Sequence, residues 1–183
     1  GMRYAVVTAK HHDGFCLWDF RTPEQFIPRE WVQAGGRPVP WETCQTFSGA
    51  WGYHRDESTW KSARQLIVML IETVGKGGNF LLNVGPTGRG TFDDRATDRL
   101  RAIGAWLRIH GRSIYGCTQA PEEFGAPRAG LLTFNPVTRR LYVHVLDWQH
   151  VRHELHQRHL RAEVREDRRE LGAHRAGAQH HQA

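Results

Sequence analysis

The feature that most constrains the fold is an alternation of helix, strand, loop and helix across residues 58–111. In its first part, apolar residues recur at three- and four-residue spacing, which predicts an amphipathic helix. Ser58 or Thr59 is suited to cap the start of this helix, and Gly75 to end it. The apolar positions are Trp60, Ala63, Ile67, Leu70, Ile71 and Val74.

The second half of the alternation predicts a strand and another helix. Asn79 to Val84 is a short apolar run typical of a buried strand. The next helix begins at Asp93 or Asp94 and ends at Gly111. Between strand and helix, residues 85–90 match neither glycine-rich phosphate-binding pattern, which favours a tight turn. Helices and strands in alternation are typical of an α/β layer or barrel.

Two further regions extend this organisation. Tyr4 to Thr8 is another short buried strand, whereas Arg21 to Pro40 is rich in proline and glycine and predicts an irregular connection. Leu131 to Phe134 and Leu141 to Leu146 predict an antiparallel hairpin. The change of pattern near Pro121 indicates that a second, β-rich region begins there.

Composition excludes several classes of protein. The chain has 183 residues and a net charge of +6, with no clustered basic face, so we expect no nucleic-acid binding. No apolar stretch is long enough for a membrane span, and no signal peptide opens the sequence, so we expect no membrane insertion. Three cysteines without a C-x-x-C pair predict buried free thiols rather than a disulfide framework or a zinc site.

The last 35 residues, 149–183, differ from the rest of the chain. They hold 7 of the 12 histidines and 7 arginines but no aromatic residue, so they cannot bury enough surface to fold alone. Four of these histidines recur every three residues, a row that drifts around a helix, and we expect adventitious metal binding at most.

Three groups of residues could carry chemistry. His11 and His12, with Asp13 at a predicted strand end, can donate hydrogen bonds to sugar hydroxyls, hold a metal or transfer protons; a polar turn is the alternative. Glu42 stands beside the indole of Trp41, an apolar neighbour that can raise the pKa of a buried carboxyl and suit it to general-acid work.

Aromatic residues form the third group. Trp51 and Tyr53 offer flat faces that suit the apolar side of a sugar ring, although core packing is the usual role of a single tryptophan.

Taken in order, five motifs resemble the α-L-fucosidase family of glycoside hydrolases. The resemblance extends from the first residues to about Trp148. The motifs are Lys10-His-His-Asp-Gly-Phe-Cys-Leu-Trp-Asp19, Trp41-Glu-Thr-Cys44, Trp51-Gly-Tyr53, Gly77-Gly-Asn-Phe-Leu-Leu-Asn-Val-Gly-Pro86, and Trp106-Leu with Ser113-Ile-Tyr-Gly116.

The resemblance implies a (β/α)8-type barrel followed by a β-sandwich, and removal of terminal α-L-fucose from glycoconjugates by a retaining mechanism without metal or cofactor. It implies that His11 and His12 bind fucose hydroxyls, that Trp51 contacts substrate and that Glu42 is the acid/base. Family members are often secreted or lysosomal; the compartment of this chain and its oligomeric state stay open.

The sequence departs from the family pattern near residues 20/21, where Trp18-Asp-Phe20 runs directly into Arg21-Thr-Pro-Glu-Gln25. The resemblance places many more residues there, including the nucleophilic Asp of a Leu-Trp-Phe-Asp-Gly-like motif that this sequence lacks. A closed barrel needs about 250 residues. We therefore expect an internal deletion and an α/β fragment of a (β/α)8-type barrel followed by the start of a β-sandwich.

The predicted domains follow from this departure. Residues 1–120 form a partial catalytic barrel, 121–148 the start of the C-terminal β-sandwich, and 149–183 a disordered or frame-shifted basic tail rich in His and Arg. An alternative function is a catalytically inactive remnant with at most weak sugar binding. A third is a basic protein whose tail associates with metal or nucleic acid.

Overall fold

A computed structural model describes residue 23, residues 25–125, residue 127 and residues 129–148. The chain divides into two compact units, one of residues 1–127 with 131–144 and one of residues 128–130 with 145–183. The expected strand over Tyr4 to Thr8 and the tail 149–183 lie outside the described residues. Among the helices that the structure does describe, none is long and apolar enough to cross a bilayer.

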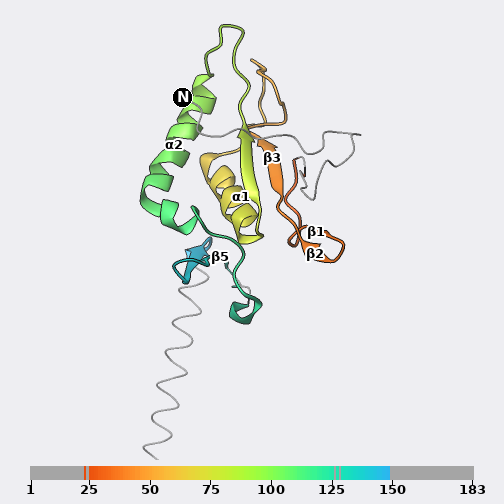
Figure 1. The fold of residues 1–183 in the computed structure, drawn as a ribbon. Helices are drawn as coiled ribbons and strands as arrows, with labels where there is room; N and C mark the ends of the chain where they lie inside the picture. The colour runs from red at the N-terminus through yellow and green to blue at the C-terminus, as the bar shows by residue number, and fades with distance from the viewer. Residues whose placement is uncertain (1–22, 24, 126, 128, 149–183) are drawn as a thin grey trace, which may run out of the picture. The chain divides into compact units, whose positions relative to one another are not determined.

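Two parallel strands carry the candidate site (Figure 1). β3 covers Glu42–Thr46 and pairs with β4, Asn79–Asn83, in a register that sets Glu42 opposite Asn79 and Thr46 opposite Asn83. The helix α1, Ala63–Gly75, connects them, which makes a β-α-β unit. The expected α/β class is therefore confirmed.

Glycines before β4 allow aromatic rings to pack against the backbone. A Cβ at Gly77 would lie 2.5 Å from the Trp31 ring, and one at Gly78 would lie 2.4 Å from the Trp41 ring. The Trp41 side chain is fully buried, and its Nε1 donates to the carbonyl of Lys76 at 3.2 Å. The Gly-Gly pair thus lets the chain enter β4 beneath two indoles.

Helix α1 covers Ala63–Gly75 and begins later than the sequence predicts. Its N-cap is Ser62, whose Oγ accepts from Gln65 N while Gln65 Oε1 accepts from Ser62 N, a capping box. The expected cap at Ser58 or Thr59 is wrong, because the hydroxyl and the backbone amide of Thr59 donate to Glu57 instead. The predicted end at Gly75 is confirmed.

Helix α2 covers Asp94–His110, with Asp93 as its N-cap and Gly111 as its C-cap, as the sequence predicts. α2 packs against α1, and α1 against β4, so the helices lie on one side of the strand pair (Figure 1). A 3-10 turn, η1, follows over Gly111–Ser113. The apolar contact between these elements is built on Ile71, Val74 and Ile114, with Ile67, Leu70, Trp106, Leu107, Cys117 and Leu131 packed around them.

The remaining elements are short. β1 (Gln33–Ala34) and β2 (Arg37–Pro38) form a small antiparallel pair inside the connection that was expected to be irregular throughout. After the 3-10 turn η2, Glu122–Phe124, the strands β5 (Gly130–Asn135) and β6 (Arg140–Val145) pair with each other, which confirms the predicted hairpin.

The cysteine prediction holds in part. Cys44 and Cys117 form no disulfide in the part of the chain that the structure describes, but both are half-buried rather than fully buried. Cys16 lies outside the described residues.

Candidate active site

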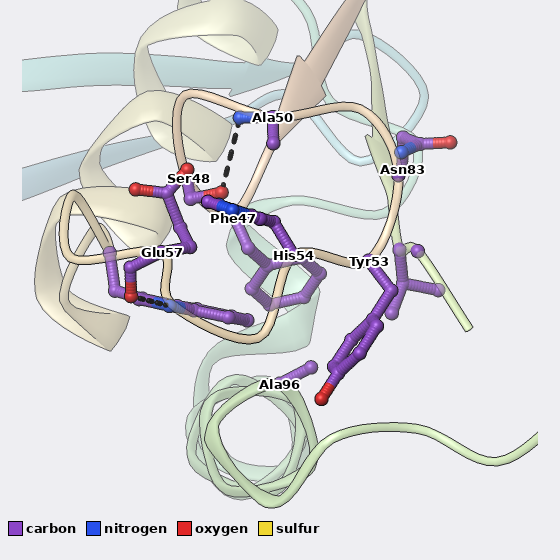
Figure 2. Close-up of a pocket in the computed structure, with 12 residues that line it drawn as sticks. Phe47, Ser48, Ala50, Tyr53, His54, Glu57, Asn83 and Ala96 are labelled. Atoms are coloured by element: carbon purple, nitrogen blue, oxygen red, sulfur yellow. Dashed lines mark hydrogen bonds between the residues drawn. The ribbon is translucent and has the colours of Figure 1, made fainter. Parts of the chain in front are cut away.

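A pocket lies at the carboxyl edge of the two parallel strands. It is a shallow hollow formed by the loops that follow β3 and β4 and by Ala96 on the first turn of α2. The side chains of Phe47, Tyr53, His54, Glu57 and Asn83 are among those that line it (Figure 2). Loops at this edge of parallel strands are where α/β folds place their ligands.

The two loops approach each other through their backbones. A Cβ at Gly85, just after β4, would lie 2.4 Å from the carbonyl carbon of Gly52 and from the amide nitrogen of Tyr53. Asn83 Nδ2 also donates to the carbonyl of Trp51 at 2.6 Å. Glycine at position 85 is therefore what allows the β3 loop to cross close to β4.

The end of β3 is fixed by a lysine. Lys61 Nζ donates to the carbonyls of Thr46 at 2.8 Å and Ser48 at 3.2 Å, while the hydroxyl of Thr46 donates to the Ser48 carbonyl in a short bond. Partial burial of this ammonium lowers the pKa of Lys61. The turn that follows β3 and forms part of the pocket wall is thus held by hydrogen bonds from Lys61 and Thr46.

Glu57 is the acidic residue among those that line the pocket. Its Oε1 accepts from Thr59 Oγ1 at 2.6 Å and from Thr59 N at 2.7 Å. These hydrogen bonds favour the charged form and lower the pKa of Glu57. The group is ionised at neutral pH, so it can accept hydrogen bonds from hydroxyl groups or take up a proton.

Glu57 is not among the candidates predicted from the sequence, because no local pattern predicts β3. Once Glu42–Thr46 is known to be a strand parallel to β4, the loop after it becomes the place to search for polar groups. The sequence does contain an indication of the site, namely an acidic residue within residues 47–60, the segment that follows β3.

Glu42 lies elsewhere. It is the first residue of β3, so four strand steps, about 13 Å, separate it from Thr46 at the carboxyl edge. Partial burial raises the pKa of Glu42, as the sequence analysis expects. The electrostatic condition for a general acid is therefore met at the end of the strand away from the pocket, and the catalytic role of Glu42 stays a prediction.

The aromatic candidates lie on the β3 loop. Tyr53 lines the pocket, and its ring points toward Ala96 of α2 (Figure 2). Trp51 stands two residues earlier, 40% exposed, and is not among the residues that line the pocket. The structure thus brings Tyr53 and Glu57 together and leaves Trp51 beside them. His11 and His12 lie outside the described residues.

Within the described ranges, no group of three or more His, Cys, Asp or Glu side chains is arranged to hold a metal ion.

An α/β unit with polar and aromatic side chains at the carboxyl edge of its parallel strands belongs to a class that many enzymes share. The sequence model of the family described as alpha-L-fucosidase matches residues 1–30 and 19–112. The chain belongs to the α-L-fucosidase family.

Relatives support the same assignment. The chain is 46% identical to the alpha-L-fucosidase of Dictyostelium discoideum over 78 residues, 42% of this chain and 17% of that protein. It is 42% identical to the human plasma alpha-L-fucosidase over 81 residues, 43% of this chain and 17% of the relative. The matched region is thus less than a fifth of the length of either relative.

Solved structures agree in fold. Alpha-L-fucosidase isoenzyme 1 from Paenibacillus thiaminolyticus superposes with a TM-score of 0.67 at 40% identity, over 71% of this chain and 30% of that one. The Thermotoga maritima alpha-fucosidase, solved in complex with fucose, gives a TM-score of 0.53 at 34% identity, over 69% of this chain and 28% of the other.

Proposed function

We propose that this chain contributes to an α-L-fucosidase that removes terminal α-L-fucose from glycoconjugates. The observation that carries the proposal is a pocket lined by Tyr53, Glu57 and Asn83 at the carboxyl edge of β3 and β4, in a chain of the fucosidase family. The fucose complex of the Thermotoga maritima neighbour supports a fucosylated glycan or glycoside as the substrate.

The chemistry of the pocket suits a sugar. Tyr53 offers an aromatic face, and the Glu57 carboxylate and the Asn83 amide offer an acceptor and a mixed donor–acceptor within the same hollow. In this proposal Trp51 packs on the sugar or its aglycone at the rim. His11 and His12 bind fucose hydroxyls, as the resemblance implies.

Between the two glutamates, position favours Glu57 for the acid/base role, whereas the raised pKa of Glu42 and the lowered pKa of Glu57 favour Glu42. A retaining glycosidase places its two carboxyl groups about 5–5.5 Å apart on either side of the glycosidic bond. Glu57 stands at the edge where such a bond can be held, whereas Glu42 begins the strand at the other end. The reaction needs a second carboxyl group beside it, and the sequence lacks the family's Leu-Trp-Phe-Asp-Gly-like motif for the nucleophile.

The finer architecture is also part of the proposal. Residues 1–120 correspond to part of a (β/α)8 barrel, 121–148 to the start of a β-sandwich and 149–183 to a separate tail. The family model matches in two stretches that meet within residues 19–30, which supports an internal junction near residues 20/21.

The test is hydrolysis of a chromogenic aryl α-L-fucoside by the full chain, with fucose binding measured by calorimetry. We expect Glu57→Gln to reduce turnover far more than Glu42→Gln, and His11→Ala to weaken binding. The opposite order of the two glutamates would return the acid/base role to Glu42. A folded chain that neither binds fucose nor hydrolyses the fucoside would refute the proposed function and leave only family membership.

A further inference from the structure

The loop that carries Glu57 is held by an arginine from a different element. Arg95 is the second residue of α2, and its Nη1 donates to the carbonyl of Glu57 at 3.0 Å. Its Nη2 donates to the carbonyl of Arg55 at 3.1 Å and lies 3.5 Å from that of His54. The hydrogen bonds of one guanidinium therefore hold the backbone of residues 54–57 against the start of α2.

Arg95 is itself fixed on its other edge. Its Nε and Nη2 donate to the two carboxylate oxygens of Asp93 at 2.8 and 2.9 Å, a bidentate pair. Asp93 is also the N-cap of α2, because its Oδ1 accepts from Arg95 N at 2.8 Å. The guanidinium lies over the Trp60 ring, with Cζ 4.7 Å from the centre. These contacts leave the arginine little freedom to turn.

Glu57 is the residue on which these contacts converge. Its carbonyl accepts from both Arg95 Nη1 and Trp60 Nε1, the second at 3.1 Å. Its carboxylate accepts from Thr59, and Glu57 is among the residues that line the pocket, whereas Arg95 is not. The backbone of Glu57 is therefore fixed from α2, and its side chain from its own loop.

We propose that Arg95 is a positioning residue for the Glu57 carboxylate, acting through the backbone of residues 54–57. The inference rests on the proposed function for its catalytic consequence. A planar guanidinium presents donors in fixed directions, so it can hold Asp93 on one edge and the loop carbonyls on the other. A lysine ammonium keeps the charge but cannot make this set of bonds.

The chain offers a matched control for this idea. Arg99 lies one turn later on α2, with Cζ 5.0 Å from the same Trp60 ring. It donates to the carbonyls of Lys61 at 2.6 Å and Arg95 at 2.9 Å, and no bond joins it to residues 54–57. Arg95→Lys and Arg99→Lys thus both keep the charge and remove similar guanidinium contacts with the Trp60 ring and with backbone carbonyls, but only the first releases the Glu57 loop.

The experiment follows the titration of Glu57 by carbon NMR of the full chain labelled at the glutamate carboxyl carbon, with Glu57→Gln to assign the signal. Arg95→Lys should raise the pKa of Glu57 toward the ordinary glutamate value, because the displaced loop weakens the bonds from Thr59. Arg99→Lys should leave it unchanged. In a chain that hydrolyses the fucoside, Arg95→Lys should also lower kcat roughly 10- to 100-fold with KM little changed.

A second variant keeps the inference testable if Arg95→Lys does not fold. Asp93→Asn keeps a capping oxygen for α2 but weakens the hold on Arg95, and should move the pKa of Glu57 in the same direction by less. An unchanged pKa in Arg95→Lys, or in Asp93→Asn where Arg95→Lys does not fold, would overturn the inference, as would equal shifts in the Arg95 and Arg99 variants. A pKa response without fucose binding by the unmodified chain would instead refute the proposed function alone.

Discussion

At position 78, the packing of a neighbouring side chain restricts the residue to glycine. Its missing side chain is the space that the buried Trp41 indole occupies, with a Cβ there only 2.4 Å from the ring. The backbone just before β4 and the indole therefore pack in direct contact, and a shift of either one would leave a gap in the packing.

Gly78→Ala should destabilise the protein by about 1–3 kcal/mol, because the new methyl group overpacks the contact with Trp41. Gly88→Ala is the control, since a Cβ at Gly88 meets nothing within 4 Å. Urea unfolding of both variants measures the difference. Equal free energies of unfolding would show that the Trp41 contact yields easily.

His144 makes stability depend on pH. Burial, with the charge of His110 adding to it, lowers the pKa of His144, whose Nε2 lies 2.9 Å from Thr133 Oγ1. The folded protein thus binds this proton less readily than the unfolded chain does, and the unfolded chain gains the proton as pH falls below about 6.5. Stability is full above that value and decreases below it.

His144→Gln should remove part of this dependence, since an amide can still bond to Thr133 but does not titrate. The measurement is the urea midpoint at about pH 7.5 and about pH 5.5 for both proteins, values on either side of the histidine pKa. An identical drop in midpoint for the two proteins would assign the effect to other histidines.

Among the elements, α1 and α2 could be predicted because helical periodicity and caps are local signals. β3 could not. Its residues Thr43 and Gln45 are polar yet buried, satisfied by a hydrogen bond between their side chains and another from Thr43 Oγ1 to the carbonyl of Phe26. No local pattern reveals that such partners exist, and the position of Glu57 could not be inferred without this strand.

The N-terminus of α1 lies at a different residue from the one that the sequence predicts, with Ser62 as its cap in place of Ser58 or Thr59. Ser62→Ala should lower the free energy of unfolding by roughly 1 kcal/mol, because it removes one half of the capping box. Ser58→Ala, at the exposed position first expected to cap the helix, should be nearly neutral. Thermal unfolding of the two variants is the measurement, and a larger loss at position 58 would restore the earlier start.

Helix α2 contains a position where a substitution should increase the stability of the protein. Gly104 lies in its interior, and a Cβ there meets nothing within 4 Å. Gly104→Ala should therefore raise the free energy of unfolding by about 0.5–1 kcal/mol through helix propensity alone. A destabilised variant in the same urea experiment would indicate that neighbouring side chains already use this space.

Across the chain as a whole, motifs from Lys10 to Gly116 indicate the family, whereas the position of the candidate site follows from the pairing of β3 with β4. The Gly-Gly-Asn motif now has a packing reason in Trp31 and Trp41, and the glycine after β4 has one in the crossing loop. The resemblance implies a role for Glu42 that the strand register does not favour, because β3 begins rather than ends at that residue.

Removal of residues 149–183 tests the function that depends on the tail. Under the proposed function, the shortened chain should bind fucose as the full chain does while losing any nickel binding that the histidine row provides. Calorimetry with fucose and with nickel measures both. Loss of fucose binding on removal of the tail would show that fucose binding depends on residues 149–183.

The close crossing of the β3 and β4 loops also limits how this pocket can be redesigned. Because a side chain at Gly85 would strike the backbone of residues 52–53, the two loops cannot be diversified independently. A combinatorial library aimed at new glycoside preferences should keep position 85 invariant. Substitutions of lining side chains such as Tyr53 can then change the pocket while the backbone junction at Gly85 stays in place.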